Sequence, residues 1–70
     1  MIQKGTEVTW KWGKGTAEGK VKEMFERTIS ITSKGTKVTR KGTPENKALY
    51  ITQENGTELL KLESEVERKN

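Results

Sequence analysis

Apolar and polar residues alternate over several short stretches of this chain, which is the pattern of half-buried β-strands. In residues 8–12 (VTWKW), Val8, Trp10 and Trp12 fall on one face of a strand, with polar residues on the other. Residues 28–32 (TISIT) alternate in the same way and are rich in β-branched side chains, which favour strands. No segment keeps a helical apolar period over the ~12 residues that an independent helix needs. The pattern therefore predicts an all-β domain.

The second strand follows a turn at residues 13–15 and shows an interruption in its alternation. Alternate positions from 17 to 25 are predicted to face inward, but Glu23 falls among them with Met24 beside it. We expect a β-bulge or a strong bend at residues 22–24, because an extra residue restores the alternation beyond it. A bend of this kind curls a small sheet into a barrel.

The remaining residues predict three more strands and one helical turn. Thr43 is placed to cap a turn of helix beginning at Pro44, where the missing proline N–H is not needed. After the last strand, Ser64 and Glu67 have the spacing of a capping box, so one frayed turn is expected there. The three strands are expected at residues 37–40, 48–53 and 57–62.

Five or six short strands, with a one-turn helix before the last strands, predict a small SH3-like barrel. The sequence contains no internal repeat and no linker, so residues 1–70 are interpreted as one domain with residues 64–70 as a frayed tail. A chain of this length buries only about 60% of the surface that its unfolded form exposes. Its core is therefore thin, and with no cysteine in the sequence no disulfide reinforces it.

The charge is basic but unevenly spread. Residues 1–53 hold 11 Lys/Arg and 5 Glu, a balance of +6, whereas residues 54–70 hold 3 Lys/Arg and 5 Glu, a balance of −2. Scattered lysines commonly serve solubility, and the same charge also suits a polyanionic partner. No apolar run approaches the ~20 residues of a membrane helix, and the first residues lack the apolar segment of a signal peptide. We expect a soluble, cytoplasmic protein that does not bind membranes.

The glycines after Trp12 do not form a phosphate-binding loop. A P-loop needs a glycine five positions before Gly19 and a Ser or Thr after Lys20, where this chain has Lys14 and Val21. We interpret these glycines as geometric: those at 13 and 15 allow a tight turn through positive φ, and Gly19 lets the second strand pass close to a tryptophan.

The side chains offer little catalytic chemistry. The sequence has no histidine and no cysteine, and its 10 acidic residues are all glutamates. It therefore provides neither the usual ligands of a structural zinc ion nor a base to activate a serine. We expect no enzymatic activity, no metal and no cofactor.

Trp12 is the residue that most favours a binding site. Trp10, at the strand centre, is expected to be the better buried tryptophan, whereas Trp12 adjoins the turn and stays partly exposed at the end of the barrel. Lys11 and Lys14 flank it, and Tyr50 is expected within reach, so these four residues form the candidate binding site. A full aromatic cage is not expected, because the four aromatic residues of the chain must also fill its core.

Three stretches carry a resemblance to a known family: KGTEVTWKWGKGTAEGKV, KGTKVTRKGTPENKALYI and NGTELLKLESEV. Together they resemble the hypervirulence-associated protein Tudor domain over nearly the whole chain. The run from Lys4 to Val21 is the most specific part, and Lys47 departs from a proline that is common in the family. The resemblance implies an SH3-like barrel with an interaction role, and it carries over no enzymatic activity, cofactor or binding residues.

The leading functional hypothesis is a module that binds a protein or peptide, since barrels of this type bind through loops and an open strand edge. Nucleic-acid binding is the alternative, because the glycines between residues 13 and 21 also resemble the KOW element of ribosomal and transcription proteins. A second alternative is a structural part of a larger assembly, although charges alternating along the strands favour a monomer. The basic rim that would contact nucleic acid consists of Lys34, Lys37, Arg40 and Lys41.

Overall fold

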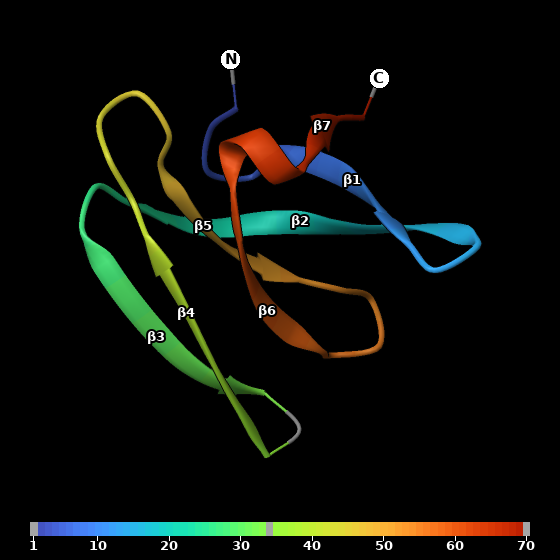
Figure 1. The fold of residues 1–70 in the computed structure, drawn as a ribbon. Coiled ribbons are helices and arrows are strands. Elements are labelled where there is room, and N and C mark those ends of the chain that lie inside the picture. The colour runs from blue at the N-terminus through green and yellow to red at the C-terminus, as the bar shows by residue number, and fades with distance from the viewer. Residues whose placement is uncertain (1, 34, 70) are drawn as a thin grey trace.

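The computed structural model describes residues 2–33 and 35–69, which form antiparallel strands and one helical turn (Figure 1). The predicted all-β class is confirmed. The elements are β1 (Glu7–Trp12), β2 (Gly15–Phe25), β3 (Thr28–Ser33), β4 (Thr36–Lys41), β5 (Ala48–Thr52), β6 (Glu58–Leu62), the 3-10 turn η1 (Glu63–Glu65) and β7 (Glu67–Arg68).

The strands form two sheets that together make a small barrel. The larger sheet has the order β6-β5-β2-β1-β7, and β3 pairs only with β4. The β3–β4 hairpin packs against β6, and Figure 1 shows it crossing the molecule at a slant to β2. The alternating segments of the sequence thus become strands that each present one face to a shared interior.

The long strand β2 connects the two halves of the larger sheet. Residues 15–20 pair with β1 and residues 20–25 pair with β5. The pairing with β5 shifts between Val21 and Glu23, which leaves Lys22 as the extra residue. The predicted bulge is therefore confirmed, and the bend lets one strand serve two neighbours.

Gly13 and Gly19 have the geometry predicted for them, and Gly15 does not. Gly13 has φ 56° in the β1–β2 turn, as expected, whereas Gly15 is the first residue of β2 and does not have a positive φ. A Cβ on Gly19 would lie 2.5 Å from Ile51 Cγ2 and 3.3 Å from the Trp10 ring. The expectation that Gly19 permits close passage beside a tryptophan is confirmed.

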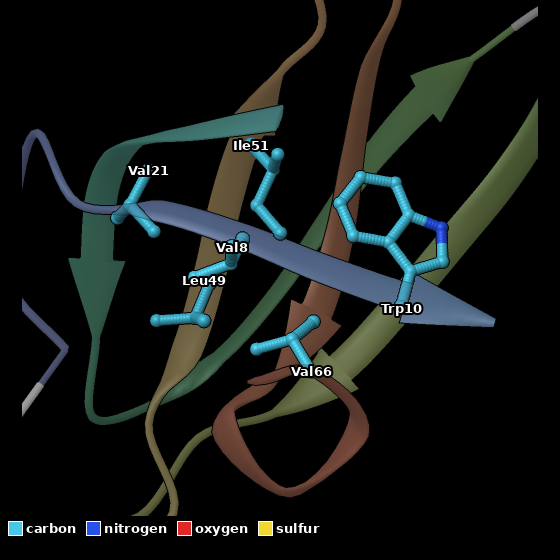
Figure 2. Packing of buried hydrophobic residues seen from close by; sticks show 6 residues of the cluster. All are labelled: Val8, Trp10, Val21, Leu49, Ile51 and Val66. Atoms are coloured by element: carbon cyan, nitrogen blue, oxygen red, sulfur yellow. The ribbon is translucent and has the colours of Figure 1, made fainter. Parts of the chain in front are cut away.

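The core consists of apolar side chains from β1, β2, β5 and the residue before β7 (Figure 2). Trp10 is 7% exposed and Trp12 is 74% exposed, which confirms the predicted difference between the two tryptophans. The clustered residues are Val8, Trp10, Val21, Leu49, Ile51 and Val66.

Residues 64–69 are anchored to the barrel, in contrast to the frayed tail expected for residues 64–70. Val66 is only 8% exposed and packs in the core, which anchors the segment. Its neighbours in β7 pair with Val8 and Thr9 of β1, and the Lys69 amide donates to the Glu7 carbonyl at 2.9 Å. Asn70 lies outside the described residues.

The helical turn also lies at a different place from the one predicted at Pro44. Thr43 and Asn46 exchange backbone hydrogen bonds of 3.0 and 3.1 Å, and the Thr43 hydroxyl accepts a further bond from the Asn46 amide. These bonds close a tight turn, which leaves no start for a helix. The helical turn is η1, close to the turn expected at Ser64. Its capping box joins Leu62 and Glu65 instead of Ser64 and Glu67, since the Glu65 carboxylate accepts from the Leu62 amide at 2.8 Å.

Candidate binding groove beside Trp12

Trp12 is the last residue of β1 and lies next to the turn at Gly13. Its cross-strand partner is Gly15, which has no side chain to cover the indole. It is the exposed large hydrophobic side chain of the described residues, at 74%. An exposed indole of this size suits contact with another molecule, because binding would remove a large apolar area from water.

A groove of 480 Å³ lies beside Trp12. The β1–β2 hairpin forms one side of it, and β4, β6 and the turn before β6 form the others. Its apolar lining residues are Trp10, Trp12, Ala17, Val38, Leu59 and Leu60, and its polar ones are Arg40, Gln53, Asn55, Thr57 and Lys61. The lining thus combines an apolar floor with hydrogen-bonding groups, as small binding sites generally do.

Lys11 and Lys14 flank Trp12 as predicted, and both are exposed. Lys11 lies on the opposite face of β1, because neighbouring residues of a strand alternate between faces. Lys14 lies in the turn. Neither lysine forms an ion pair within residues 2–33 and 35–69.

Tyr50 does not join this site. It pairs with Glu23 of β2, whereas Trp12 pairs with Gly15, eight positions away along the same strand (23 − 15 = 8). The Lys22 ammonium lies 5.6 Å from the centre of the Tyr50 ring. A hydrogen bond with Glu58 raises the pKa of the Tyr50 hydroxyl. The structure therefore places Tyr50 in a separate polar cluster.

The predicted basic rim is not one surface. Lys37 and Lys41 are exposed on the outer face of the β3–β4 hairpin, while Arg40 lies at the opposite parity of β4 together with Val38. Arg40 lines the groove, and its charge is paired. Lys34 lies outside the described residues.

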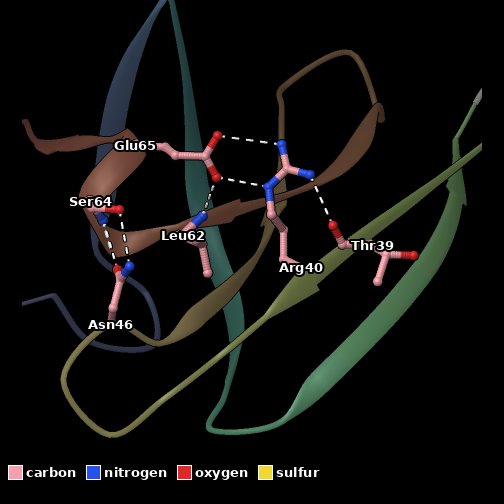
Figure 3. A network of polar contacts seen from close by, with 6 residues as sticks. All are labelled: Thr39, Arg40, Asn46, Leu62, Ser64 and Glu65. Atoms are coloured by element: carbon pink, nitrogen blue, oxygen red, sulfur yellow. Dashed lines mark hydrogen bonds and ion pairs between the residues drawn. The ribbon is translucent and has the colours of Figure 1, made fainter.

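The partner of Arg40 is Glu65 of η1 (Figure 3). The guanidinium donates to both carboxylate oxygens, at 2.8 and 3.3 Å, and to the Thr39 carbonyl at 2.9 Å. Two further bonds between Asn46 and Ser64, of 3.0 and 3.1 Å, hold the same turn. These contacts fix the hairpin wall of the groove to the segment that leads into β7.

Partial burial acts to raise the pKa of Glu65, but the hydrogen bonds from Arg40 and the Leu62 amide, with the positive charges of Arg40 and Lys61, outweigh it and lower the pKa below its ordinary value of 4.5. A carboxylate with a lower pKa in the folded state stabilises the fold above its unfolded pKa, and this contribution is lost as pH falls through the folded value.

We therefore expect Glu65→Gln to lower the free energy of unfolding by about 1 kcal/mol at neutral pH. The difference from the unsubstituted protein should shrink once the pH falls below 4.5, where the carboxylate becomes protonated. Urea denaturation at a series of pH values measures both quantities. Glu45→Gln is the control, because Glu45 is exposed and has no ion pair within the described residues. A constant difference at every pH would contradict the expectation.

The polar side of the groove could not be predicted from the sequence. Gln53, Asn55, Thr57 and Lys61 come from the β5–β6 hairpin, which the Asn-Gly turn predicts. Nothing local shows which part of the chain that hairpin faces, because the contact joins residues far apart in sequence.

Residues 2–33 and 35–69 hold no group of three or more His, Cys, Asp or Glu side chains arranged to bind a metal ion. Within the same residues, no helix is both long enough and apolar enough to span a membrane.

The bulged β2, the strand order and the short turns define a small Tudor-like or SH3-like β-barrel. The chain belongs to the family of Tudor domains of hypervirulence-associated proteins, because the model of that family matches residues 5–66. The family predicted from the sequence is thus confirmed. Neither a curated protein nor a solved structure matches the chain. Tudor domains are generally non-catalytic, and membership of this family supports a binding role.

Proposed function

We propose that this chain is a non-enzymatic binding module that takes a segment of another protein into the groove beside Trp12. The observation that carries the proposal is the 74% exposure of Trp12 at the edge of a 480 Å³ groove. Tryptophan is among the residues that contribute most to binding free energy when a partner covers them. Family membership supports the same role.

The polar side of the groove suits a peptide backbone. Gln53, Asn55 and Thr57 line it with side-chain amides and a hydroxyl, which both donate and accept hydrogen bonds. An extended peptide presents N–H and C=O groups at regular intervals, together with a side chain for the indole. The groove therefore matches a peptide in both apolar area and hydrogen bonding.

The arrangement of cations favours a peptide over nucleic acid. Binding a nucleic-acid strand uses a row of cations along its phosphates. In the described part of the chain, the lysines at 37 and 41 face away from the groove, and Arg40 is paired with Glu65. The groove thus lacks the row of free cations that a phosphate backbone would follow.

We also propose that the module acts as a monomer. The edge of β1 is a surface that a second copy could pair with, but β7 covers it at Val8 and Thr9. An exposed Lys11 follows on the same strand, and a charged edge discourages pairing between copies.

Selection from a library of random displayed peptides tests the binding role. We expect the unsubstituted domain and Lys41→Ala to retain peptides with equal affinity, and Trp12→Ala to bind them about tenfold more weakly or worse, as for the loss of a central aromatic contact. Lys41 is a suitable control because it is exposed on the outer hairpin face. Failure to select any peptide, or equal affinity of Trp12→Ala, would overturn the proposal.

A further inference from the structure

The charges around the groove have one sign. Lys61 lines the groove and Lys14 lies in the turn next to Trp12, and neither forms an ion pair within residues 2–33 and 35–69. The described lining includes no glutamate. A partner that enters this groove therefore meets ammonium groups with no carboxylate among the lining side chains to balance them.

The carboxylate that pairs with the lining residue Arg40 does not cancel this charge. Glu65 is bonded to Arg40 and also feels the charge of Lys61, so these three residues sum to +1 (two cations minus one anion). Lys14 adds one more positive charge. Arg40, Lys61, Lys14 and Glu65 together therefore carry a net charge of +2.

Other hollows of the surface are not polarised in this way. The hollow between β2 and β5 contains Glu7, Glu18 and Glu54 beside its lysines. The hollow along β1 and η1 contains Glu65 and Glu67 beside Lys11 and Lys61. The groove beside Trp12 thus combines lining charges of one sign with an exposed tryptophan. A site with both features selects its partner by charge and by apolar contact.

We propose that the groove binds an acidic peptide, namely an extended segment with an apolar side chain on Trp12 and Asp or Glu carboxylates facing Lys14 and Lys61. This rests on the proposed function, because it names the partner of the same groove. Exposed charges contribute modestly to affinity and strongly to the rate of encounter and to the choice of partner. The indole supplies the apolar contact, and the lysines select for negative charge.

The peptides retained from the random library are the probe for this inference. We expect them to carry more Asp and Glu than the starting library. Replacement of these acids by Asn and Gln should weaken binding about tenfold, and added salt should weaken binding of the acidic forms more than that of the amide forms. A retained pool without excess acid, or amide forms that bind equally, would overturn the inference and leave the binding role of Trp12 intact.

Two double variants of equal charge locate the effect. The first, Lys14→Gln/Lys61→Gln, should lose about tenfold in affinity for the acidic peptides and almost none for the amide forms. The second replaces two exposed lysines away from the groove. It is Lys37→Gln/Lys41→Gln, and it should keep its affinity. Equal losses in both would overturn the assignment to the groove. Unfolding in urea, measured on both variants, separates loss of affinity from loss of fold.

Competition with oligouridylate separates a peptide partner from nucleic acid. We expect it to displace the acidic peptides only at concentrations far above their own dissociation constants. Displacement at lower concentrations would overturn the peptide as the preferred partner. Loss of all binding in the first double variant but not in Trp12→Ala would instead contradict the proposed function, because the groove would then act through charge alone.

Discussion

Replacement of Trp10 by alanine is expected to destabilise the domain by about 3 to 5 kcal/mol, the usual cost of removing a buried aromatic side chain. Trp10 is 7% exposed and packs with Val8, Ile51 and Val66 in a core of few residues. A domain of this length has a total stability of only about 4 to 10 kcal/mol. Trp10→Ala should therefore be largely unfolded at moderate urea concentrations, as far-ultraviolet circular dichroism would show.

Trp12→Ala is the matched control for this loss. Its side chain is 74% exposed, so its removal should change the free energy of unfolding by no more than about 0.5 kcal/mol. Equal destabilisation by the two substitutions would mean that both tryptophans belong to the core. The same variant must fold normally for its loss of peptide binding to report on the groove.

Gly42→Ala is expected to cost about 3 kcal/mol, at the upper end of the usual penalty for overpacking. Gly42 is buried between β4 and β5, and its amide donates to the Arg27 carbonyl at 3.1 Å. An added Cβ would collide with the Phe25 carbonyl oxygen and lie 2.8 Å from the Ala48 amide nitrogen. Both are backbone atoms at the end of a strand pair, so neither moves without breaking the pairing of β2 with β5. Urea denaturation followed by tryptophan fluorescence measures the loss.

Gly15→Ala is the control for a glycine without this constraint. The nearest atom to its added Cβ is the Trp12 carbonyl oxygen at 4.0 Å, and its φ is not positive. The substitution should change stability by less than about 1 kcal/mol, and a gain is expected from the reduced freedom of the unfolded chain. A larger loss at residue 15 than at residue 42 would contradict the packing described at Gly42.

Local periodicity explains the part of the fold that could be predicted from the sequence. The side-chain period of two makes Trp10 and Trp12 share a face, and the position next to the turn accounts for the exposure of Trp12. The interrupted parity at Glu23 reveals the bulge for the same reason. Each of these features depends on neighbours within a few residues, which a single sequence displays.

Features that depend on distant residues could not be predicted. The sequence groups Arg40 with its neighbouring lysines in a basic rim. It does not show the ion pair of Arg40, because Glu65 lies 25 residues away. The sequence also does not show that Tyr50 is distant from Trp12. That distance follows from their partners on β2, Glu23 and Gly15, which lie far apart along the strand. The order of the last residues depends on the contact of Val66 with the core, again across the length of the chain.

The hairpin of β3 and β4 forms a sheet of its own, and this separation has a consequence for the groove. The ties to the rest of the barrel include the Ser33 hydroxyl on the Glu58 carbonyl at 2.8 Å and the Arg40–Glu65 ion pair. A unit held by few hydrogen bonds opens locally at a lower free energy than the sheet it covers. Such excursions would widen the groove at Val38 while β1, β2 and β5 stay paired, so one barrel could accommodate partner side chains of different size.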